Sequence, residues 1–467
     1  MLFSSISFIY YFLPMVLMLY FMVPFRFKNC ILLISSLFFY FYGEPIYSVL
    51  ILISSLSAYL HGLWIDKLRK SRYAKLPLIC SIIFSVGILL YFKYADFFIE
   101  NINWLFGFEI SPLKIVLPIG ISFYTFQILS YTIDVYNGNA KVQNNFFNFA
   151  AYVTLFPQLI AGPIVRYTAV EQELSQRKHT FANFSYGVNR FIVGLSKKVL
   201  IANTLGELGK IFYNLQESTL LFYWIAAISF MLQIYYDFSG YSDMAIGLGR
   251  IFGFHFLENF NYPYISKSIS EFWRRWHISL GTWFRDYVYI PMGGNRVGTV
   301  KWIRNIFVVW FLTGFWHGAN WNFVIWGLYF GIFLIIEKIF LNGILNKLPA
   351  IAGHIYTLFF VIISFVIFNT NNMSECIEYI KGMFGALNIP FSSAETEYYL
   401  RSYGLTFVIA AFGATPLTVK VINKIKYSKK GEHILNILEP VVLVSMLLLV
   451  TGYLVDGSFN PFLYFRF

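Results

Sequence analysis

The sequence predicts an all-α, polytopic integral membrane protein that crosses the bilayer about 11 to 12 times. Apolar residues make up 58% of the 467 residues and charged residues only 12%, whereas a soluble domain carries roughly 25% charged residues. Aromatic residues account for 21%, and Tyr and Trp favour the headgroup level of a bilayer. No hydrophilic stretch is long enough to form a separate soluble domain, so we expect a single membrane domain over residues 1–467.

Apolar runs of about 20 residues, the length that spans the hydrocarbon core of a bilayer, follow one another along the chain. Some are expected to be half-spans, interfacial helices, re-entrant segments or broken helices. We divide the domain into N-terminal spans at 1–110, a core at 111–345 and C-terminal spans at 346–467. The expected spans lie near residues 5–24, 29–43, 47–65, 76–98, 113–136, 147–164, 187–205, 219–236, 306–316 and beyond, 321–341, 351–369, 402–421 and 436–454.

The distribution of Lys and Arg predicts the orientation in the cell membrane. The first 25 residues contain neither, so the basic region of a cleavable signal peptide is missing. Arg26 and Lys28 follow the first apolar run, and five more basic residues lie from Lys67 to Lys75. Cytoplasmic loops retain Lys and Arg, so we expect an extracytoplasmic N-terminus. The net charge of +12 is mostly this topology signal, and no basic soluble face predicts nucleic acid as a partner.

The three cysteines indicate no special chemistry. Cys30, Cys80 and Cys376 are unevenly spaced and lie in or beside apolar runs, which is typical of small buried hydrophobic residues. No CxxC or thiol–His spacing predicts zinc or a thiol nucleophile. We therefore expect no metal and no bound cofactor.

A polar stretch directly after an apolar run interrupts the pattern at Asp237–Asp243. Gly240 and Gly247 allow close helix approach or re-entrant turns. Backbone that is not a regular span survives at membrane depth only where protein or a watery cavity surrounds it. We expect this segment to line a cavity, where Asp237 and Asp243 are either helix caps or members of a reaction centre.

Residues 270–287 fit one amphipathic helix. Arg274 and Arg285 fall on one flank at 100° per residue, and Glu271 and Arg275 are spaced for an i, i+4 pair. An aromatic face with basic flanks also suits a helix in the membrane interface, so a structural role for the histidine on that face stays open. The aromatic face consists of Trp273, Trp276, His277, Leu280, Phe284 and Tyr287.

A glycine turn and further basic residues follow this helix. The amides of Gly293 and Gly294 are suited to cradle a phosphate. Arg274, Arg285 and Arg296 together predict a cytoplasmic phosphate-binding mouth. Ordinary positive-inside charge accounts for each arginine taken singly.

One histidine, His317, lies between the strongly apolar stretches Ile306–Trp316 and Phe323–Ile336. An ionisable side chain in a bilayer is costly and by default functional. A neutral imidazole accepts a proton near pH 7, which makes it a general base. His277 forms a second Trp-His pair forty residues upstream. The two pairs predict one reaction centre inside the membrane protein.

Five long motifs follow one another between residues 237 and 318. They are Asp237-Phe-Ser-Gly-Tyr-Ser-Asp243, Asn259-Phe-Asn-Tyr-Pro-Tyr264, Glu271-Phe-Trp-Arg-Arg-Trp-His-Ile-Ser-Leu280, Trp283-Phe-Arg-Asp-Tyr287 to Pro291-Met-Gly-Gly-Asn-Arg296, and Thr313-Gly-Phe-Trp-His-Gly318. Together they resemble the membrane-bound O-acyltransferase (MBOAT) superfamily, in the branch of the alginate and peptidoglycan O-acetylation membrane proteins. Phe156–Pro163 and Phe462–Phe467 fit the same branch.

The resemblance implies a bundle of membrane helices around a funnel or tunnel. It implies that His317 is the catalytic residue and that His277 is the second polar residue of the site. The side chains expected to line the cavity are Asp237, Asp243, Trp276, Trp316 and Asn320.

The expected activity is transfer of an acyl group, above all acetyl, from a cytoplasmic thioester such as acetyl-CoA. The acceptor would be a hydroxyl on the extracytoplasmic side. Because the chain has no soluble domain to grip a polymer, we expect a relay to a separate esterase-like transferase within a polysaccharide-modifying machinery. The glycan itself stays open.

Three alternatives are weighed against this activity. The first is D-alanyl transfer from a carrier protein to teichoic acid, the activity of a related branch of the superfamily. A transporter could run a proton or solute path through polar residues such as Asp134 and His317. A metal site of His277, His317 and an aspartate has no support from ligand spacing.

Overall fold

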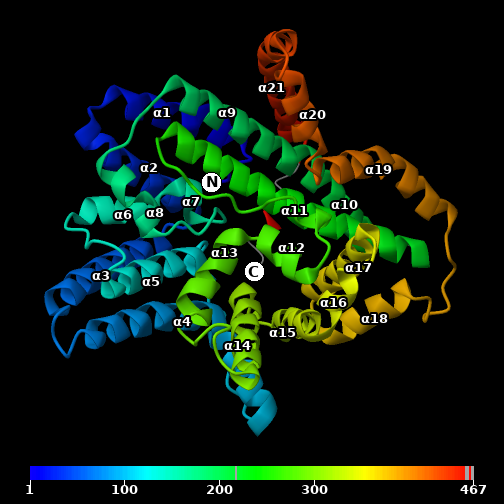
Figure 1. Ribbon diagram of the computed structural model, residues 1–467, viewed down its shortest axis with the longest axis horizontal. Helices are drawn as coiled ribbons and strands as arrows, with labels where there is room; N and C mark the ends of the chain where they lie inside the picture. Colours follow the sequence, from blue (N-terminus) through cyan, green and yellow to red (C-terminus); the bar gives the residue numbers. More distant parts are fainter. Residues whose placement is uncertain (216–217, 458–461, 464–467) are drawn as a thin grey trace. The chain divides into compact units, whose positions relative to one another are not determined.

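The computed structural model describes residues 1–215, 218–457 and 462–463, and within these ranges the chain consists of helices and loops without a strand (Figure 1). The predicted all-α class is confirmed. Of the motif Phe462–Phe467, the last four residues lie outside the described ranges. The chain divides into two compact units, residues 1–191 with 242–257 and residues 192–241 with 258–467.

The first unit is a helical cluster. Its elements are the π-helix η1 (Ser7–Phe12), α1 (Leu13–Met22), α2 (Phe25–Gly43), α3 (Tyr47–Leu68), α4 (Lys75–Phe106), α5 (Ile121–Asn137), α6 (Phe146–Thr154), α7 (Phe156–Leu159), α8 (Tyr167–Ser175), most of α9 (Phe181–Ser196) and the end of α11 (Leu220–Ile251). Helices α3, α4 and α5 pack against one another (Figure 1). A side-chain carbon at Gly62 of α3 would lie 2.6 Å from the hydroxyl of Tyr131 on α5, so a small residue sets this approach.

The second unit carries the remaining helices. They are η2 (Lys197–Ala202), α10 (Asn203–Phe212), the first part of α11, η3 (Pro263–Ile265), α12 (Ile269–Arg275), α13 (Ile278–Phe284), η4 (Arg285–Tyr289), α14 (Thr299–His317), α15 (Trp321–Ile336), η5 (Glu337–Leu341), α16 (Asn342–Leu345), α17 (Ala350–Asn369), α18 (Met373–Met383), α19 (Ala394–Gly413), α20 (Leu417–Lys426) and α21 (Lys429–Asp456). Helices α14 and α15 form a tight hairpin, in which a side-chain carbon at Gly314 would lie 3.1 Å from the Cα of Gly327.

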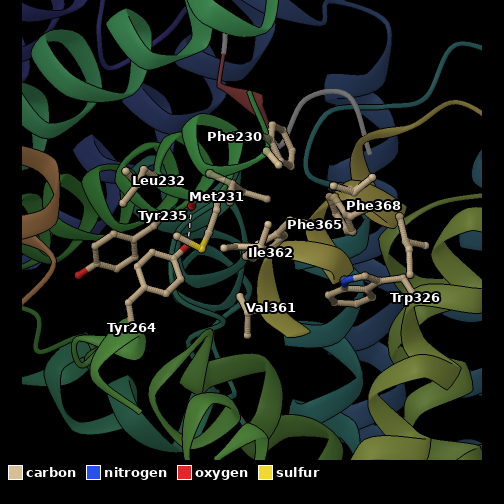
Figure 2. Packing of buried hydrophobic residues seen from close by; sticks show 14 of the residues in the cluster. Phe230, Met231, Leu232, Tyr235, Tyr264, Trp326, Val361, Ile362, Phe365 and Phe368 are labelled. Atoms are coloured by element: carbon tan, nitrogen blue, oxygen red, sulfur yellow. Dashed lines mark hydrogen bonds between the residues drawn. The ribbon is translucent and has the colours of Figure 1, made fainter. Parts of the chain in front are cut away.

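A hydrophobic core holds α11, α15 and α17 of the second unit together. Figure 2 shows Phe230, Met231 and Tyr235 of α11 near Ile362 and Phe365 of α17. Tyr264 of η3 enters the same cluster and donates a hydrogen bond to the carbonyl of Met231. The core therefore fixes the helices on which the two Trp-His sites depend.

Six described helices are long and apolar enough to cross a membrane, and the pair α19 and α20, bent by 64°, would be a seventh. The six are α3, α4, α11, α15 with its continuation to Leu345, α17 and α21. This composition makes the chain a multi-pass membrane protein. The other expected spans form shorter or less apolar helices, so the count of about 11 to 12 crossings stays a prediction.

The polar stretch Asp237–Asp243 is helical, so the prediction of a cap or re-entrant segment at this point is wrong. Helix α11 continues through both aspartates to Ile251. The one glycine in this stretch serves close packing: a side-chain carbon at Gly240 would lie 2.7 Å from the carbonyl oxygen of Gly194. Ser, Gly and Asp favour turns in isolation, but buried helix neighbours override that preference here.

The single helix predicted over 270–287 is also wrong, because it breaks at Trp276 and His277. Helix α12 ends at Arg275 and α13 begins at Ile278. The backbone of a distant segment stabilises the break, since the Ile278 amide donates to the Asn259 carbonyl at 2.9 Å and the Asn261 amide donates to the Arg275 carbonyl at 2.9 Å. The predicted Glu271–Arg275 pair is confirmed, with an Nη2–Oε1 distance of 2.9 Å.

Candidate active site

His277 lies in the break between α12 and α13 and is buried, with a positive φ of 45°. Its Nδ1 is 3.1 Å from Oδ1 of Asn259, which also accepts hydrogen bonds from the backbone amide and the hydroxyl of Ser279. An amide oxygen only accepts, so Nδ1 carries a proton and the neutral ring has its lone pair on Nε2. Burial lowers the pKa of His277 to about 3, so the ring is neutral at pH 7.

His317 is the last residue of α14 and is also buried. Its ring centroid is 5.0 Å from that of Trp326 on α15 and 5.5 Å from that of Phe368 on α17. Both aromatic residues belong to the core in Figure 2. The next residue, Gly318, has no room for a side chain, because an added carbon would overlap the ring of Phe323. The glycine of the Trp-His-Gly motif therefore allows the chain to turn directly after His317.

One indole contacts both histidines. The Trp316 centroid lies 6.1 Å from that of His277 and 5.0 Å from that of His317. The structure thus brings the two predicted catalytic histidines to one place within the second unit. Trp276 points elsewhere: its ring stacks on Phe272 in the hydrophobic core, with a centroid distance of 5.5 Å.

The predicted cavity-lining aspartates take part in ion pairs. Asp237 pairs with Lys198 at 2.5 Å, and both side chains are almost completely buried. Its other carboxylate oxygen accepts from the backbone amide of Leu463 at 2.8 Å. Asp243 pairs with Arg190 at 2.6 Å. These contacts explain both carboxylates structurally, and a role in a cavity wall stays a prediction.

Asn320 caps α15. Its side-chain oxygen accepts from the amide of Asn322 at 3.2 Å, and its side-chain amide donates to the carbonyl of Asn371 at 2.9 Å. It therefore fixes the start of the helix that follows the Trp-His-Gly turn.

A cavity of about 690 Å³ in the second unit contains three cationic side chains, those of Lys267, Arg274 and Lys338. The Lys338 ammonium lies over the ring of Trp302, 4.1 Å from its centroid. Of the three arginines predicted to form a phosphate-binding mouth, only Arg274 lines this basic cavity. The remaining lining residues are Ser268, Ser270, Glu271, Tyr289, Ile306, Leu334, Asn342, Leu345, Asn346, Leu348, Pro349, Ala350 and Gly353.

The other two predicted arginines lie at exposed positions. Arg285 pairs with the neighbouring Asp286 at 2.6 Å, and 58% of its side chain is exposed. Arg296 is exposed on the loop before α14. Their predicted role in donor binding stays untested. Among the described residues, no group of three His, Cys, Asp or Glu side chains is close enough to hold a metal ion.

Comparison with known proteins decides the family. A sequence profile of the membrane-bound O-acyltransferase family matches residues 139–374, which include both Trp-His sites. The chain belongs to this family. It is therefore an O-acyltransferase with several membrane-spanning helices.

Curated relatives cover most or all of the chain. The probable alginate O-acetylase AlgI of Pseudomonas aeruginosa is 43% identical over 82% of this chain and 75% of its own length. The protein of the same name from Azotobacter vinelandii is 37% identical over the full length of both chains. The peptidoglycan O-acetyltransferase of Helicobacter pylori is 34% identical over 82% of this chain and 80% of its own.

Sequence reasoning missed Glu337, which is fully buried. Its carboxylate accepts hydrogen bonds from the amides of Ile269 and Ser270, at 2.5 and 2.8 Å, and from the Ser270 hydroxyl at 2.6 Å. It thereby fixes the start of α12, the helix that carries Arg274 and leads into His277. A signal was present, because a lone carboxylate at the end of an apolar run is expensive at membrane depth.

Proposed function

We propose that this O-acyltransferase transfers an acetyl group from a cytoplasmic thioester to an extracytoplasmic hydroxyl, as a step in O-acetylation of an exported or cell-surface polysaccharide. The names of the relatives, two probable alginate O-acetylases and a peptidoglycan O-acetyltransferase, support an acetyl group and a glycan. The observation that carries the proposal is the pair of buried histidines in contact with one indole.

His317 acts as the general base in this proposal. Its imidazole removes the proton of the acceptor hydroxyl as the oxygen attacks the thioester carbonyl. The carbon–sulfur bond then breaks, and the imidazolium returns the proton to the thiolate. The surrounding rings of Trp316, Trp326 and Phe368 limit the access of water, and this protects the thioester from hydrolysis.

His277 orients a reactant rather than accepting its proton. The bond from Nδ1 to Asn259 fixes the direction in which Nε2 points. Burial lowers the pKa of His277 to about 3, which makes it a poor base at neutral pH. A neutral ring that presents one fixed nitrogen is suited to hold a hydrogen-bond donor in place.

The basic cavity is the proposed site for the phosphates of the donor. Its three cations suit phosphate. Trp302 in the cavity and His317 lie fifteen residues apart on α14, which corresponds to about 22 Å along the helix axis. A donor that uses both places therefore needs a long, thin arm between its phosphates and its thioester. The phosphopantetheine arm of acetyl-CoA, or of a carrier protein, has this form.

Acetyl transfer in opened membranes that retain the native acceptor tests the proposal. With labelled acetyl-CoA, His317→Ala should lower transfer by about 10²–10⁴-fold, the usual cost of losing a general base. His317→Asn should be nearly as inactive. The matched control is His433→Ala, at an exposed position of α21, which should behave as wild type. A folded His317→Ala protein with the wild-type rate would overturn the proposed mechanism.

The same membranes separate the rival activities. A D-alanyl transferase would use a D-alanyl carrier protein and leave acetyl-CoA untouched. A transporter would move substrate across sealed vesicles without any thioester.

The relay to a separate extracytoplasmic transferase is part of the proposal, and the AlgI relatives support a polysaccharide machinery. Cross-linking and co-purification from native membranes should recover an esterase-like partner. Full acetylation of the polymer by the purified chain alone would exclude the relay.

A further inference from the structure

Two cationic side chains and a histidine meet around Tyr20 in the first unit, far in sequence from the Trp-His sites. Lys28 lies on α2, while Arg177 and His179 lie between α8 and α9. The Lys28 ammonium donates to the Tyr20 carbonyl at 3.0 Å and lies 4.1 Å from the centroid of its ring. Arg177 Nε donates to the Tyr20 hydroxyl at 2.9 Å, and His179 Nε2 is 2.9 Å from that hydroxyl.

No carboxylate among the described residues pairs with Lys28 or Arg177, although only 9% and 8% of their surfaces are exposed. Glu173 offers Arg177 its backbone carbonyl, at 3.0 Å, while its carboxylate binds the backbone amide and ring of His255. The Nη2 nitrogen of Arg177 is buried without a hydrogen-bond partner. Buried charges in proteins are usually paired, because an unpaired charge is costly to take out of water.

The cations also act on one another. Burial, followed by the charges of Lys28 and Arg177, lowers the pKa of His179. The cluster therefore repels additional positive charge, and an anion placed between its members would relieve this repulsion. Lys ammonium and Arg guanidinium groups with free N–H donors are the partners that a phosphate requires.

The surroundings of the cluster identify the source of the anion. Phe21, Met22, Phe25 and Phe27 are large apolar residues that are 40–75% exposed, as expected for a surface in contact with lipid. They lie beside Arg26 and Lys28 at the start of α2, which the positive-inside pattern places on the cytoplasmic side. The cytoplasmic leaflet carries anionic phospholipids that attract basic segments at this depth.

We propose that Lys28, Arg177 and His179 bind the phosphate group of an anionic phospholipid from the cytoplasmic leaflet. The Lys28 ammonium and Arg177 Nη2 donate hydrogen bonds to phosphate oxygens. The Tyr20 hydroxyl donates a hydrogen bond to the Phe252 carbonyl, at 2.8 Å, so the hydrogen bond between Tyr20 and His179 is donated by Nε2 of the imidazole. The other ring nitrogen, Nδ1, is therefore the one that takes up a proton when the anion binds. The lipid ties together the start of α2 and the segment before α9.

The test compares thermal unfolding of the full-length protein in nanodiscs of phosphatidylcholine alone with nanodiscs that also contain phosphatidylglycerol, an anionic phospholipid. Phosphatidylglycerol should raise the unfolding temperature of the wild type. Lys28→Met keeps the apolar stem and removes the charge, so it should lose most of this rise. Arg26→Gln is the matched control, because Arg26 is an exposed cation in the same first turn of α2; it should keep the rise apart from a small loss of general attraction.

The difference between the two lipids, rather than stability itself, is the readout. If Lys28 had only a structural role, Lys28→Met would lower the unfolding temperature by the same amount in both kinds of nanodisc, and this result would contradict the proposal. Arg177→Gln is a second variant, because its loss of affinity for phosphatidylglycerol, expected to be about tenfold or more, is measurable by native mass spectrometry on the folded fraction. An equal rise from inorganic phosphate or from acetyl-CoA in phosphatidylcholine nanodiscs would overturn a lipid as the occupant.

Discussion

His277 has a backbone conformation that residues with a side chain rarely adopt. Its φ of 45° and ψ of 53° lie in the left-handed region, at a cost of about 1–2 kcal/mol for an ordinary residue. Such strain tends to occur at functional sites. Here it turns the chain between α12 and α13 and places the ring against Asn259 and Trp316.

Substitution of His277 by Asn should preserve the fold and part of the activity. Asn tolerates the left-handed region better than most residues and still donates and accepts hydrogen bonds. His277→Ala should lose both advantages and fall further in activity. Thermal unfolding and acetyl transfer, measured side by side for the two variants, check this order; equal activities would show that hydrogen bonding at this position is irrelevant to the reaction.

The low pKa of His277 predicts a pH dependence of stability. Its pKa is about 3 in the folded protein, compared with an ordinary value of 6.5. The unfolded chain therefore binds a proton that the folded chain refuses, and the free energy of unfolding should fall as the pH falls from 6.5 towards 3. Unfolding temperatures in detergent at pH 7.5 and 4.5 should differ less for His277→Asn than for wild type. An unchanged difference would mean that other groups determine the acid sensitivity.

That the two histidines belong to one site could be predicted from the sequence, but the geometry of the site could not. An imidazole beside Trp in a chain of this hydropathy indicates function whatever the local structure. The left-handed turn at His277 depends on backbone hydrogen bonds with Asn259 and Asn261, which lie more than twelve residues away. Local periodicity contains no trace of such a contact, and it therefore predicted one unbroken helix.

At the level of helices, Glu337 is expected to hold α12 in place. Its carboxylate accepts three hydrogen bonds at the start of that helix, and bonds to a charged group contribute about 1.5–3 kcal/mol each. Glu337→Gln should lower the unfolding temperature and reduce kcat, because α12 positions Arg274 and leads into His277. Glu397→Gln, which removes an exposed ion pair with Arg401, is the control and should change little. A Glu337→Gln enzyme with unchanged kcat would show that α12 needs no such anchor.

The basic cavity predicts different effects for two arginines that the sequence placed on one helix flank. Arg274 lines the cavity on α12, whereas Arg285 pairs with Asp286 at an exposed position. Arg274→Gln should raise the apparent KM for the thioester more than it lowers kcat, since it removes a contact to phosphate and not to the reacting atoms. Arg285→Gln should leave KM nearly unchanged. The opposite order would move the donor site to the exposed loop.

Helix α11 shows how burial overrides local preference. Asp237–Asp243 has the composition of a loop, yet its carboxylates pair with Lys198 and Arg190, and its one glycine allows a neighbouring backbone to approach. Paired charges and small residues make this polar stretch compatible with a buried helix. The sequence shows the residues but not their partners, which lie about forty to fifty residues earlier.

For the whole molecule, composition predicted a helical membrane protein because twelve per cent charge cannot cover a soluble surface of this size. The helices differ in how much of them the protein covers. Only 6% of the apolar segment of α21 is buried within the protein, compared with 72% for α11. Periodicity could not predict this difference, because the apolar residues of neither helix gather on one face. Which helix becomes the interior one depends on the small residues and ion pairs of its neighbours.

The orientation of the whole chain can be tested at the two ends of α4. This helix begins at Lys75, at the end of a segment with five basic residues from Lys67 to Lys75, and its 32 residues end at Phe106. It extends about 48 Å, so its ends should lie on opposite sides of the membrane. The positive-inside rule puts the loop with Ser71 in the cytoplasm and the segment with Glu109 outside.

Single cysteines at these two positions, introduced after Cys30, Cys80 and Cys376 are changed to Ala, distinguish the two orientations. An impermeant maleimide should label Glu109→Cys in intact cells, since this position is exposed, and Ser71→Cys only after the membrane is opened. The reverse labelling pattern would show that the protein has the opposite orientation in the membrane. It would also place Lys28, at the start of α2, outside the cell and away from the anionic inner leaflet. The orientation therefore decides whether the lipid site can be supplied from the cytoplasmic leaflet.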